Sequence, residues 1–225
     1  MEPNQMLESL KIFMAGSPFQ WAVCGGFALD LFLGKNIRTH GDMDLCVLEQ
    51  DRESIKKYAL SKGWQVYEFR GWGKVRPLEY HIPSDPGRNL MCVREGCDIV
   101  KFYPCEDPGM RYHQFFHTGM KEFYYLEFLF SSTCGEDLVL DQRNGLRREL
   151  SKAFLCRDGI PYLAPEIVLL YKASDSENPA YQLDFTETYP HLNGDQKNWF
   201  QAGMKLLYPD GHPWANQSAA TDGSF

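Results

Sequence analysis

The sequence lacks the cysteine spacings that mark a zinc site or a redox centre. Its seven cysteines are an odd number and include no Cys-x-x-Cys pair. Several of them stand in apolar, strand-like segments, where cysteine behaves as a small hydrophobic residue. We therefore expect free thiols in a reducing environment and predict a cytoplasmic protein.

Long apolar segments, repeats and an excess of basic residues are also missing. No apolar run approaches the roughly 20 residues that cross a bilayer. The first residues, MEPNQMLESLKIFMAG, lack the basic start of a signal peptide. The formal net charge is −7, whereas nucleic-acid-binding domains usually carry a basic face. We therefore expect neither a membrane anchor nor a nucleic-acid partner.

Strand-like and helix-like segments alternate over roughly the first 145 residues. Helical spacing of apolar residues covers 5–15, 27–34 and 52–63. Strand-like segments cover 21–24, 42–48, 64–69, 75–82, 89–94, 97–103 and 123–130. This order predicts a mixed sheet with helices packed on it.

After about residue 145 the pattern becomes helical. The segments GLRRELSKAFLC, LAPEIVLLYKAS and NWFQAGMKLLYP are predicted helices, and Pro165 suits the first position of the second one. The tail after Trp214 is small and polar, so we expect it to be loose. We predict an α+β protein with a core over residues 1–145 and a C-terminal helical region over residues 146–225.

Two carboxylates, Asp42 and Asp44, stand two positions apart where a strand-like segment begins. Residues i and i+2 of a strand point to the same face, so these side chains converge. Like charges this close repel each other unless something offsets them. A divalent cation does so directly, and Mg²⁺ commonly binds one or two carboxylates together with substrate phosphates. The pair therefore predicts a metal–phosphate site.

The residues before the pair supply groups suited to a phosphate. Gly25 and Gly26 have no Cβ, so the backbone can approach a ligand closely. A helix that starts at Phe27 would add amide groups and a favourable dipole. Arg38 is a forked donor suited to phosphate. His40 shares the strand parity of the two aspartates and could orient a phosphate or a carboxylate.

In order and spacing, these residues resemble the nucleotidyltransferase superfamily of DNA polymerase β type. Within it they are most similar to the aminoglycoside 2″-nucleotidyltransferases and the lincosamide nucleotidyltransferases. Those proteins carry a Gly-Gly-Trp turn and helix, followed by Thr-Arg-x-His-x-Asp-x-Asp. The matching residues here are Gly25, Gly26, Phe27, Ala28, Asp30, Arg38, His40, Asp42 and Asp44, with Phe27 in place of Trp and Ile37 in place of Thr. The resemblance implies a polymerase β-like core whose mixed sheet is flanked by helices.

A second set of matches lies in the C-terminal part. The family has a Pro-Glu-x-x-Leu-Leu-Tyr-Lys helix, found here at 165–172, an Asp-Phe pair, found at 184–185, and a late His-Pro-Trp, found at 212–214. The lysine–aspartate pair that precedes Asp-Phe in the family is missing, and Ala180 and Tyr181 stand in its place. If that pair serves the substrate or the nucleotide, this contact is altered here.

The resemblance implies a metal-dependent enzyme that moves a nucleoside monophosphate, AMP by this likeness, from a nucleoside triphosphate such as ATP. The acceptor would be a hydroxyl group of a small molecule, such as an aminoglycoside or lincosamide antibiotic. Two Mg²⁺ ions roughly 4 Å apart would clamp the attacking and leaving oxygens. The alternative is a catalytically idle protein that binds a nucleotide or a partner on the same fold. A third, narrower possibility is transfer to a protein hydroxyl.

The resemblance also implies a third carboxylate from a later strand, which ligates the second metal or takes the hydroxyl proton. We predict Asp98 for this role, as metal ligand and catalytic residue, because it stands in the apolar, strand-like segment GCDIVKFY. Glu79 and Glu127, which also stand in strand-like segments, remain alternatives.

Further candidates concern the nucleotide and the acceptor. Lys172 ends the apolar face of its helix, and we predict that its ammonium group reaches the triphosphate. The alternative basic cluster is Arg143, Arg147 and Arg148. A cationic aminoglycoside would need carboxylates around it, for which the candidates are Glu122, Glu127, Glu136, Asp137 and Asp141.

Overall fold

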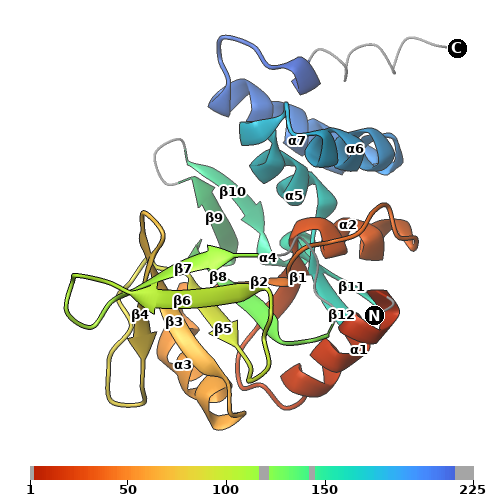
Figure 1. Cartoon of the computed structure of the whole chain (residues 1–225). Coiled ribbons are helices and arrows are strands. Elements are labelled where there is room, and N and C mark those ends of the chain that lie inside the picture. Colours follow the sequence, from red (N-terminus) through yellow and green to blue (C-terminus); the bar gives the residue numbers. More distant parts are fainter. Residues whose placement is uncertain (1–2, 117–121, 142–144, 216–225) are drawn as a thin grey trace, which may run out of the picture. The chain divides into compact units, whose positions relative to one another are not determined.

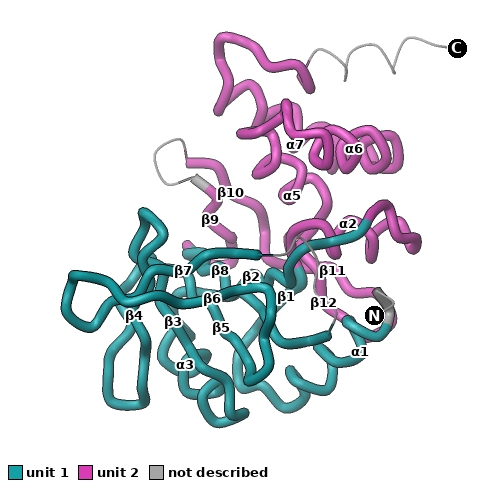
Figure 2. Tube along the Cα trace, viewed as in Figure 1, with its two compact units in different colours: residues 1–23, 39–133 teal, residues 24–38, 134–225 magenta. Residues whose placement is uncertain are grey.

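The computed structural model describes residues 3–116, 122–141 and 145–215 (Figure 1). The tail from residue 216 and Arg143 of the predicted basic cluster lie outside these ranges. The chain divides into two units: unit 1 comprises residues 1–23 and 39–133, and unit 2 comprises residues 24–38 and 134–225 (Figure 2). This division differs from the predicted boundary at residue 145. Among the described residues, no helix has the length and apolar composition needed to cross a bilayer.

Unit 1 is built on a mixed sheet with the strand order β1-β2-β8-β5-β3-β4-β7-β6. Strands β2 and β8 are parallel, and the pairs from β8 through β6 are antiparallel. The strands are β1 (Trp21–Cys24), β2 (Asp44–Leu48), β3 (Gln65–Gly71), β4 (Lys74–Leu78), β5 (Leu90–Val93), β6 (Val100–Pro104), β7 (Arg111–Phe115) and β8 (Tyr125–Cys134). The helical elements are α1 (Pro3–Met14), η1 (Glu49–Asp51) and α3 (Arg52–Ser61). The predicted mixed sheet with helices is confirmed.

The core of unit 1 follows from its apolar strand residues. Strand β5 is buried along its whole length, and β2 is buried after its first residue, which explains why both are continuous apolar runs in the sequence. One core cluster consists of Tyr67, Val75, Met91, Val93, Ile99, Val100 and Tyr125. Helix α1 packs through Phe13, whose ring centroid lies 5.0 Å from that of Trp64 and 5.7 Å from that of Tyr58 in α3. These aromatic contacts anchor α1 and α3 in the unit.

Unit 2 combines four longer helices with two antiparallel strand pairs, β9–β10 and β11–β12. Helix α5 contacts α2, α6 and α7 (Figure 1). The helices are α2 (Gly25–Leu33), α4 (Leu150–Ala153), α5 (Pro165–Lys172), η2 (Ala173–Asp175), α6 (Pro179–Thr188), η3 (Tyr189–His191) and α7 (Gly194–Leu207). The strands are β9 (Asp137–Asp141), β10 (Leu146–Glu149), β11 (Phe154–Arg157) and β12 (Ile160–Leu163).

The late motif residues form part of the core of unit 2. The ring of Phe185 in α6 stacks on Trp214, with 4.4 Å between centroids, and on Tyr189, with 5.0 Å. Trp214 is fully buried, and its indole N–H donates to Gln182 at 2.8 Å. The Asp-Phe and His-Pro-Trp matches therefore hold the helices of this unit together.

The predicted helix over residues 145–156 is wrong, because only α4 is helical there and strands β10 and β11 flank it. Along β10 the side chains alternate between buried and exposed, with Arg148 buried. The Arg148 guanidinium donates to Glu166 and to Asp195, at 2.7 Å in each case. The sequence does not distinguish the buried Arg148 from the exposed Arg147. The alternation of buried and exposed residues that marks a strand was therefore not recognisable in it.

Candidate active site

The register of two strands in unit 1 places a third carboxylate beside the aspartate pair. Asp44, the first residue of β2, pairs with Glu127 of β8 in parallel register, and the backbone N–H of Glu127 donates to the carbonyl of Met43 at 2.8 Å. Residues paired in this way extend their side chains from the same face of a sheet. Asp42 is exposed and precedes β2 by two residues, and its charge acts on Glu127. Asp42, Asp44 and Glu127 therefore form one acidic group.

Glu127 lies in an unusual environment for a carboxyl group. The pKa of Glu127 is raised to about 7. Burial is the largest cause, a hydrogen bond from Tyr125 opposes the rise, and the charge of Asp42 adds to it. The donor of that bond is the hydroxyl of Tyr125, a fully buried residue two positions earlier on β8. Burial, and after it the charge of Glu127, also raises the pKa of Tyr125. A carboxyl group with a pKa near 7 is suited to accept and release a proton at neutral pH.

Glu127 also lines a pocket of about 430 Å³ that belongs to unit 1. The other lining residues are Phe69, Gly71, Gly87, Arg88 and Asn89. The lining thus includes one carboxylate, one aromatic residue, two glycines and two residues with N–H donors in their side chains. A small ligand in this pocket would touch Glu127.

Asp98, the predicted third carboxylate, lies elsewhere in unit 1. Strand β6 begins at Val100, so Asp98 is exposed in the turn before it, where its charge acts on Cys97 and Tyr124. Glu79 is exposed after β4. The strand pairing therefore places Glu127, and neither Asp98 nor Glu79, next to Asp44.

The acidic group fits a hard divalent cation by its chemistry. Carboxylate oxygens are the ligands that Mg²⁺ prefers. The pKa of Glu127 is raised mainly by burial and further by the negative charge of Asp42, and a cation would offset that charge. Within the described parts of the chain, no three His, Cys, Asp or Glu side chains are already grouped as a metal site. Asp42 is exposed at this site, so its carboxylate is open to solvent.

The raised pKa of Glu127 predicts a pH dependence of stability without added metal. Because the folded protein holds the proton of Glu127 more tightly than the unfolded chain does, this contribution is fully present below pH 4.5 and is lost as the pH rises through 7. The stability of the wild type relative to Glu127→Gln should therefore fall between pH 5 and pH 8. Urea unfolding across this range measures it, with Glu79→Gln, an exposed acid, as control. Parallel profiles for wild type and Glu127→Gln would show that Glu127 has an ordinary pKa.

The predicted phosphate-binding glycines lie at the start of α2 in unit 2. The helix begins at Gly25 rather than at Phe27, and Cys24 before it is extended. Gly25 has φ of 66°, in the left-handed region that favours glycine. The sequence placed the helix start two residues late because a Gly-Gly pair usually marks a turn. The phosphate contact itself stays a prediction, as does the role of His40, which is buried in unit 1.

Arg38 and Lys172, both predicted to bind the nucleotide, share a carboxylate in unit 2. Asp184 of α6 is fully buried and accepts two hydrogen bonds from Arg38, at 2.9 Å each, and one contact from the Lys172 ammonium at 2.9 Å. That ammonium also lies 4.0 Å from the ring centroid of Tyr181. Burial by itself raises the pKa of Asp184, but the contacts from Arg38 and Lys172 outweigh burial and hold the pKa below its usual value.

This ion group gives Arg38 and Lys172 a structural role in unit 2, and their contact with a nucleotide stays a prediction. The role of Asp184 in this ion group was not predicted from the sequence. The available signal was an acid inside the apolar helical segment YQLDF, which indicates a buried partner for a base.

A protein-family model matches part of the chain. Residues 7–88 match the model of the aminoglycoside-2″-adenylyltransferase family. This match confirms, over residues 7–88, the resemblance that the motif indicated. The matched part includes Gly25, Gly26, Arg38, His40, Asp42 and Asp44. It ends before Asp98 and Glu127, so it does not decide between them.

Solved structures of three similar proteins cover most of this chain at low identity. The antibiotic-resistance factor ANT(2″)-Ia is 13% identical over 93% of this chain and 96% of its own, with a TM-score of 0.47. The lincosamide antibiotic adenylyltransferase LnuA is 12% identical, and the match covers 82% of this chain and 94% of LnuA, with a TM-score of 0.49. A nucleotidyltransferase-like protein from Paracoccidioides brasiliensis is 15% identical, and the match covers 97% of this chain and 92% of that protein, with a TM-score of 0.44. Comparison with curated proteins gives no match.

Proposed function

We propose that this nucleotidyltransferase moves a nucleoside monophosphate, AMP in the first instance, from a nucleoside triphosphate to a hydroxyl group of a small molecule. The observation that carries the proposal is the pairing of Asp44 with Glu127, which adds a third carboxylate to the Asp42–Asp44 pair. The family description makes aminoglycosides the first acceptors to test, and lincosamides the second.

In the proposed reaction, Asp42 and Asp44 hold Mg²⁺, and Glu127 takes the proton of the acceptor hydroxyl. The acceptor oxygen forms a bond to the α-phosphorus, the bond between the α-phosphorus and its bridging oxygen breaks, and pyrophosphate leaves. Bound Mg²⁺ would supply charge neutralisation and orientation of the phosphates. Tyr125 positions Glu127 through the hydrogen bond to its carboxylate.

The second candidate function is binding of a nucleotide or a partner without turnover. It is favoured by the altered segment in α6, where Ala180 and Tyr181 replace the lysine–aspartate pair of the family. In unit 2 the ring of Tyr181 lies against the Lys172 ammonium, so an aromatic contact stands where the family has charged side chains. Detectable turnover excludes this candidate.

Pyrophosphate release tests the proposal. The wild type is incubated with Mg²⁺, each of the four nucleoside triphosphates and a panel of hydroxyl compounds, alongside Glu127→Gln and Asp98→Asn. We expect release with at least one nucleotide, and a loss of at least about 100-fold in Glu127→Gln, because a general base contributes about 10²–10⁴-fold. Asp98→Asn should keep wild-type activity. Full activity in Glu127→Gln together with an inactive Asp98→Asn would return the third-carboxylate role to Asp98.

A further inference from the structure

Two of the residues that line the pocket beside Glu127, Arg88 and Asn89, have N–H donors in their side chains. Asn89 accepts from the backbone N–H of Phe130 through its side-chain oxygen, at 3.1 Å, which leaves the amide NH₂ as its donor. Arg88 contributes a guanidinium group, and Glu127 is the one carboxylate among the lining residues. Phe69 adds an aromatic face. This chemistry suits a ligand that brings acceptor oxygens or negative charge.

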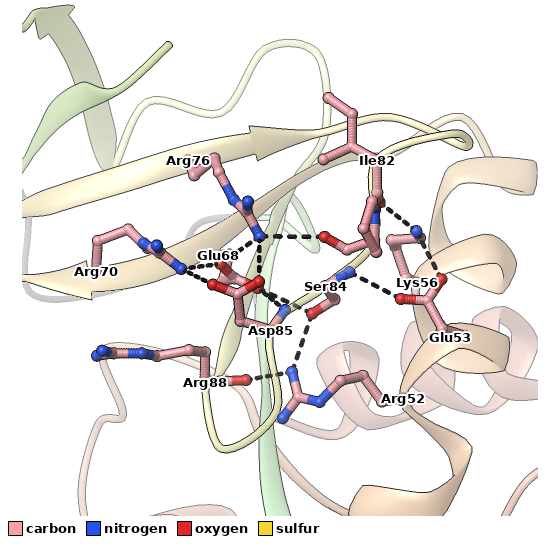
Figure 3. Close-up of polar contacts among 11 residues, drawn as sticks. Arg52, Glu53, Lys56, Glu68, Arg70, Arg76, Ile82, Ser84, Asp85 and Arg88 are labelled. Atoms are coloured by element: carbon pink, nitrogen blue, oxygen red, sulfur yellow. Dashed lines mark hydrogen bonds and ion pairs between the residues drawn. The ribbon is translucent and has the colours of Figure 1, made fainter. Parts of the chain in front are cut away.

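The wall that carries Arg88 is fixed by buried ionic contacts in unit 1 (Figure 3). Glu68 of β3 is fully buried and accepts from Ser84 Oγ at 3.0 Å and from the backbone N–H of Asp85 at 2.6 Å. Arg70 and Arg76 contact both Glu68 and Asp85. The connection between β4 and β5 is therefore held onto β3.

Two bases from α3 hold the same connection from its other side. Arg52 donates to Ser84 Oγ at 3.0 Å and to the backbone carbonyl of Arg88 at 2.5 Å. Lys56, 1% exposed, donates to the carbonyl of Ile82 at 2.5 Å. The backbone of Arg88 is thus tied to α3, which fixes where its side chain starts.

The positive and negative charges of this network are equal in number, and the side chain of Arg88 is not part of its ion pairs. Four basic side chains stand against four acidic ones: Arg52, Lys56, Arg70 and Arg76 against Glu49, Glu53, Glu68 and Asp85. Figure 3 shows the side chain of Arg88 extending away from Arg52, with no dashed line to its guanidinium, whereas its backbone oxygen accepts from Arg52. Its guanidinium is therefore available to a ligand in the pocket.

We propose that this pocket binds an anionic substrate group, a phosphate or a carboxylate, through Arg88 and Asn89. The inference rests on the proposed function and narrows its substrate class. Of the acids considered for binding a polycation, Glu127 is among the lining residues of this pocket, and Glu122 lines a different pocket of unit 1. The anionic group belongs either to the nucleotide or to the acceptor.

The test uses Arg88→Gln and Arg88→Lys, with Arg94→Gln, an exposed arginine at the other pocket, as the matched control. Binding of inorganic triphosphate, glucose 6-phosphate, glucose and tobramycin is measured with Mg²⁺ by calorimetry, which needs no turnover. We expect Arg88→Gln to weaken an anionic probe about tenfold or more, as loss of a charged hydrogen bond does, and Arg88→Lys to weaken it less. Arg94→Gln should bind as the wild type does.

The two anionic probes separate the sources of the group. Weakened binding of triphosphate alone assigns Arg88 to the nucleotide, and weakened binding of glucose 6-phosphate alone assigns it to the acceptor. If the wild type binds neither probe, binds tobramycin more tightly than both, or loses no affinity in Arg88→Gln, the inference is overturned. Pyrophosphate release by the wild type is scored separately: its absence rejects the proposed function, whatever the effect of Arg88→Gln on binding.

Discussion

Asp44→Asn should lose nucleotidyl transfer almost completely while the chain keeps its fold. Asp44 starts β2 and pairs with Glu127, so the substitution removes one of the three negative charges of the acidic group. Substitution of a residue that orients a metal ligand lowers metal affinity or activity by about 10–100-fold. Asp44 is proposed as a ligand itself, so we expect Asp44→Asn to lower the activity by at least about 100-fold. Pyrophosphate release under saturating Mg²⁺ measures the effect.

The reason to expect an intact fold is that asparagine has the size of aspartate, and Asp44 is only half-buried at the end of a strand. The matched control is Glu95→Gln, an equivalent loss of charge at an exposed position of unit 1. It should behave as the wild type in both activity and thermal unfolding. If Asp44→Asn releases pyrophosphate at the wild-type rate, Asp44 holds no metal needed for turnover.

Asp184→Asn should be the most destabilising of the single substitutions considered. Asp184 is fully buried and offsets both Arg38 and Lys172, so its neutralisation leaves two cations together with no carboxylate between them. Breaking a buried ion pair by removing one partner costs about 3–5 kcal/mol. For a chain of this size that corresponds to a fall in Tm of roughly 10 °C. Thermal and urea unfolding measure the change.

The same helix provides a matched control for Asp184→Asn. Glu187 pairs with Lys35 at 2.6 Å, but both side chains are exposed, so Glu187→Gln should change the stability far less than Asp184→Asn does. The double variant Asp184→Asn with Lys172→Met should recover part of the loss, because it removes one uncompensated charge. Equal stability of Asp184→Asn and Glu187→Gln would mean that the buried ion group contributes little.

The sequence was most informative where the chemistry is local. The spacing of Asp42 and Asp44 and the preceding glycines indicated the acidic site and the family, because both depend on neighbours along one strand and one turn. Apolar runs bounded by glycine likewise predicted β1, α2 and β2. The helix start at Gly25 differed by two residues from the prediction, since a Gly-Gly pair does not show by itself whether the helix includes it.

The contacts that the sequence did not indicate join distant parts of the chain. Glu127 reaches Asp44 only because β2 and β8 pair in parallel, and no local pattern reports that pairing. Asp98 was preferred because GCDIVKFY reads as one strand, whereas a turn at 94–97 delays β6 until after it. The burial of Arg148 and Asp184 was not predicted for a related reason: the sequence does not show the buried partner of a charged residue.

The most direct test of the proposed site is thermal unfolding of the wild type and Asp44→Asn with ATP, GTP, CTP and UTP, each with and without Mg²⁺. A ligand at 100 times its Kd stabilises the native state by about 2.7 kcal/mol, which raises Tm by roughly 5–10 °C. We predict such a rise for at least one nucleotide in the wild type, only with Mg²⁺, and no rise in Asp44→Asn. No rise with any nucleotide, or an equal rise in Asp44→Asn, would contradict a metal–nucleotide site at these carboxylates.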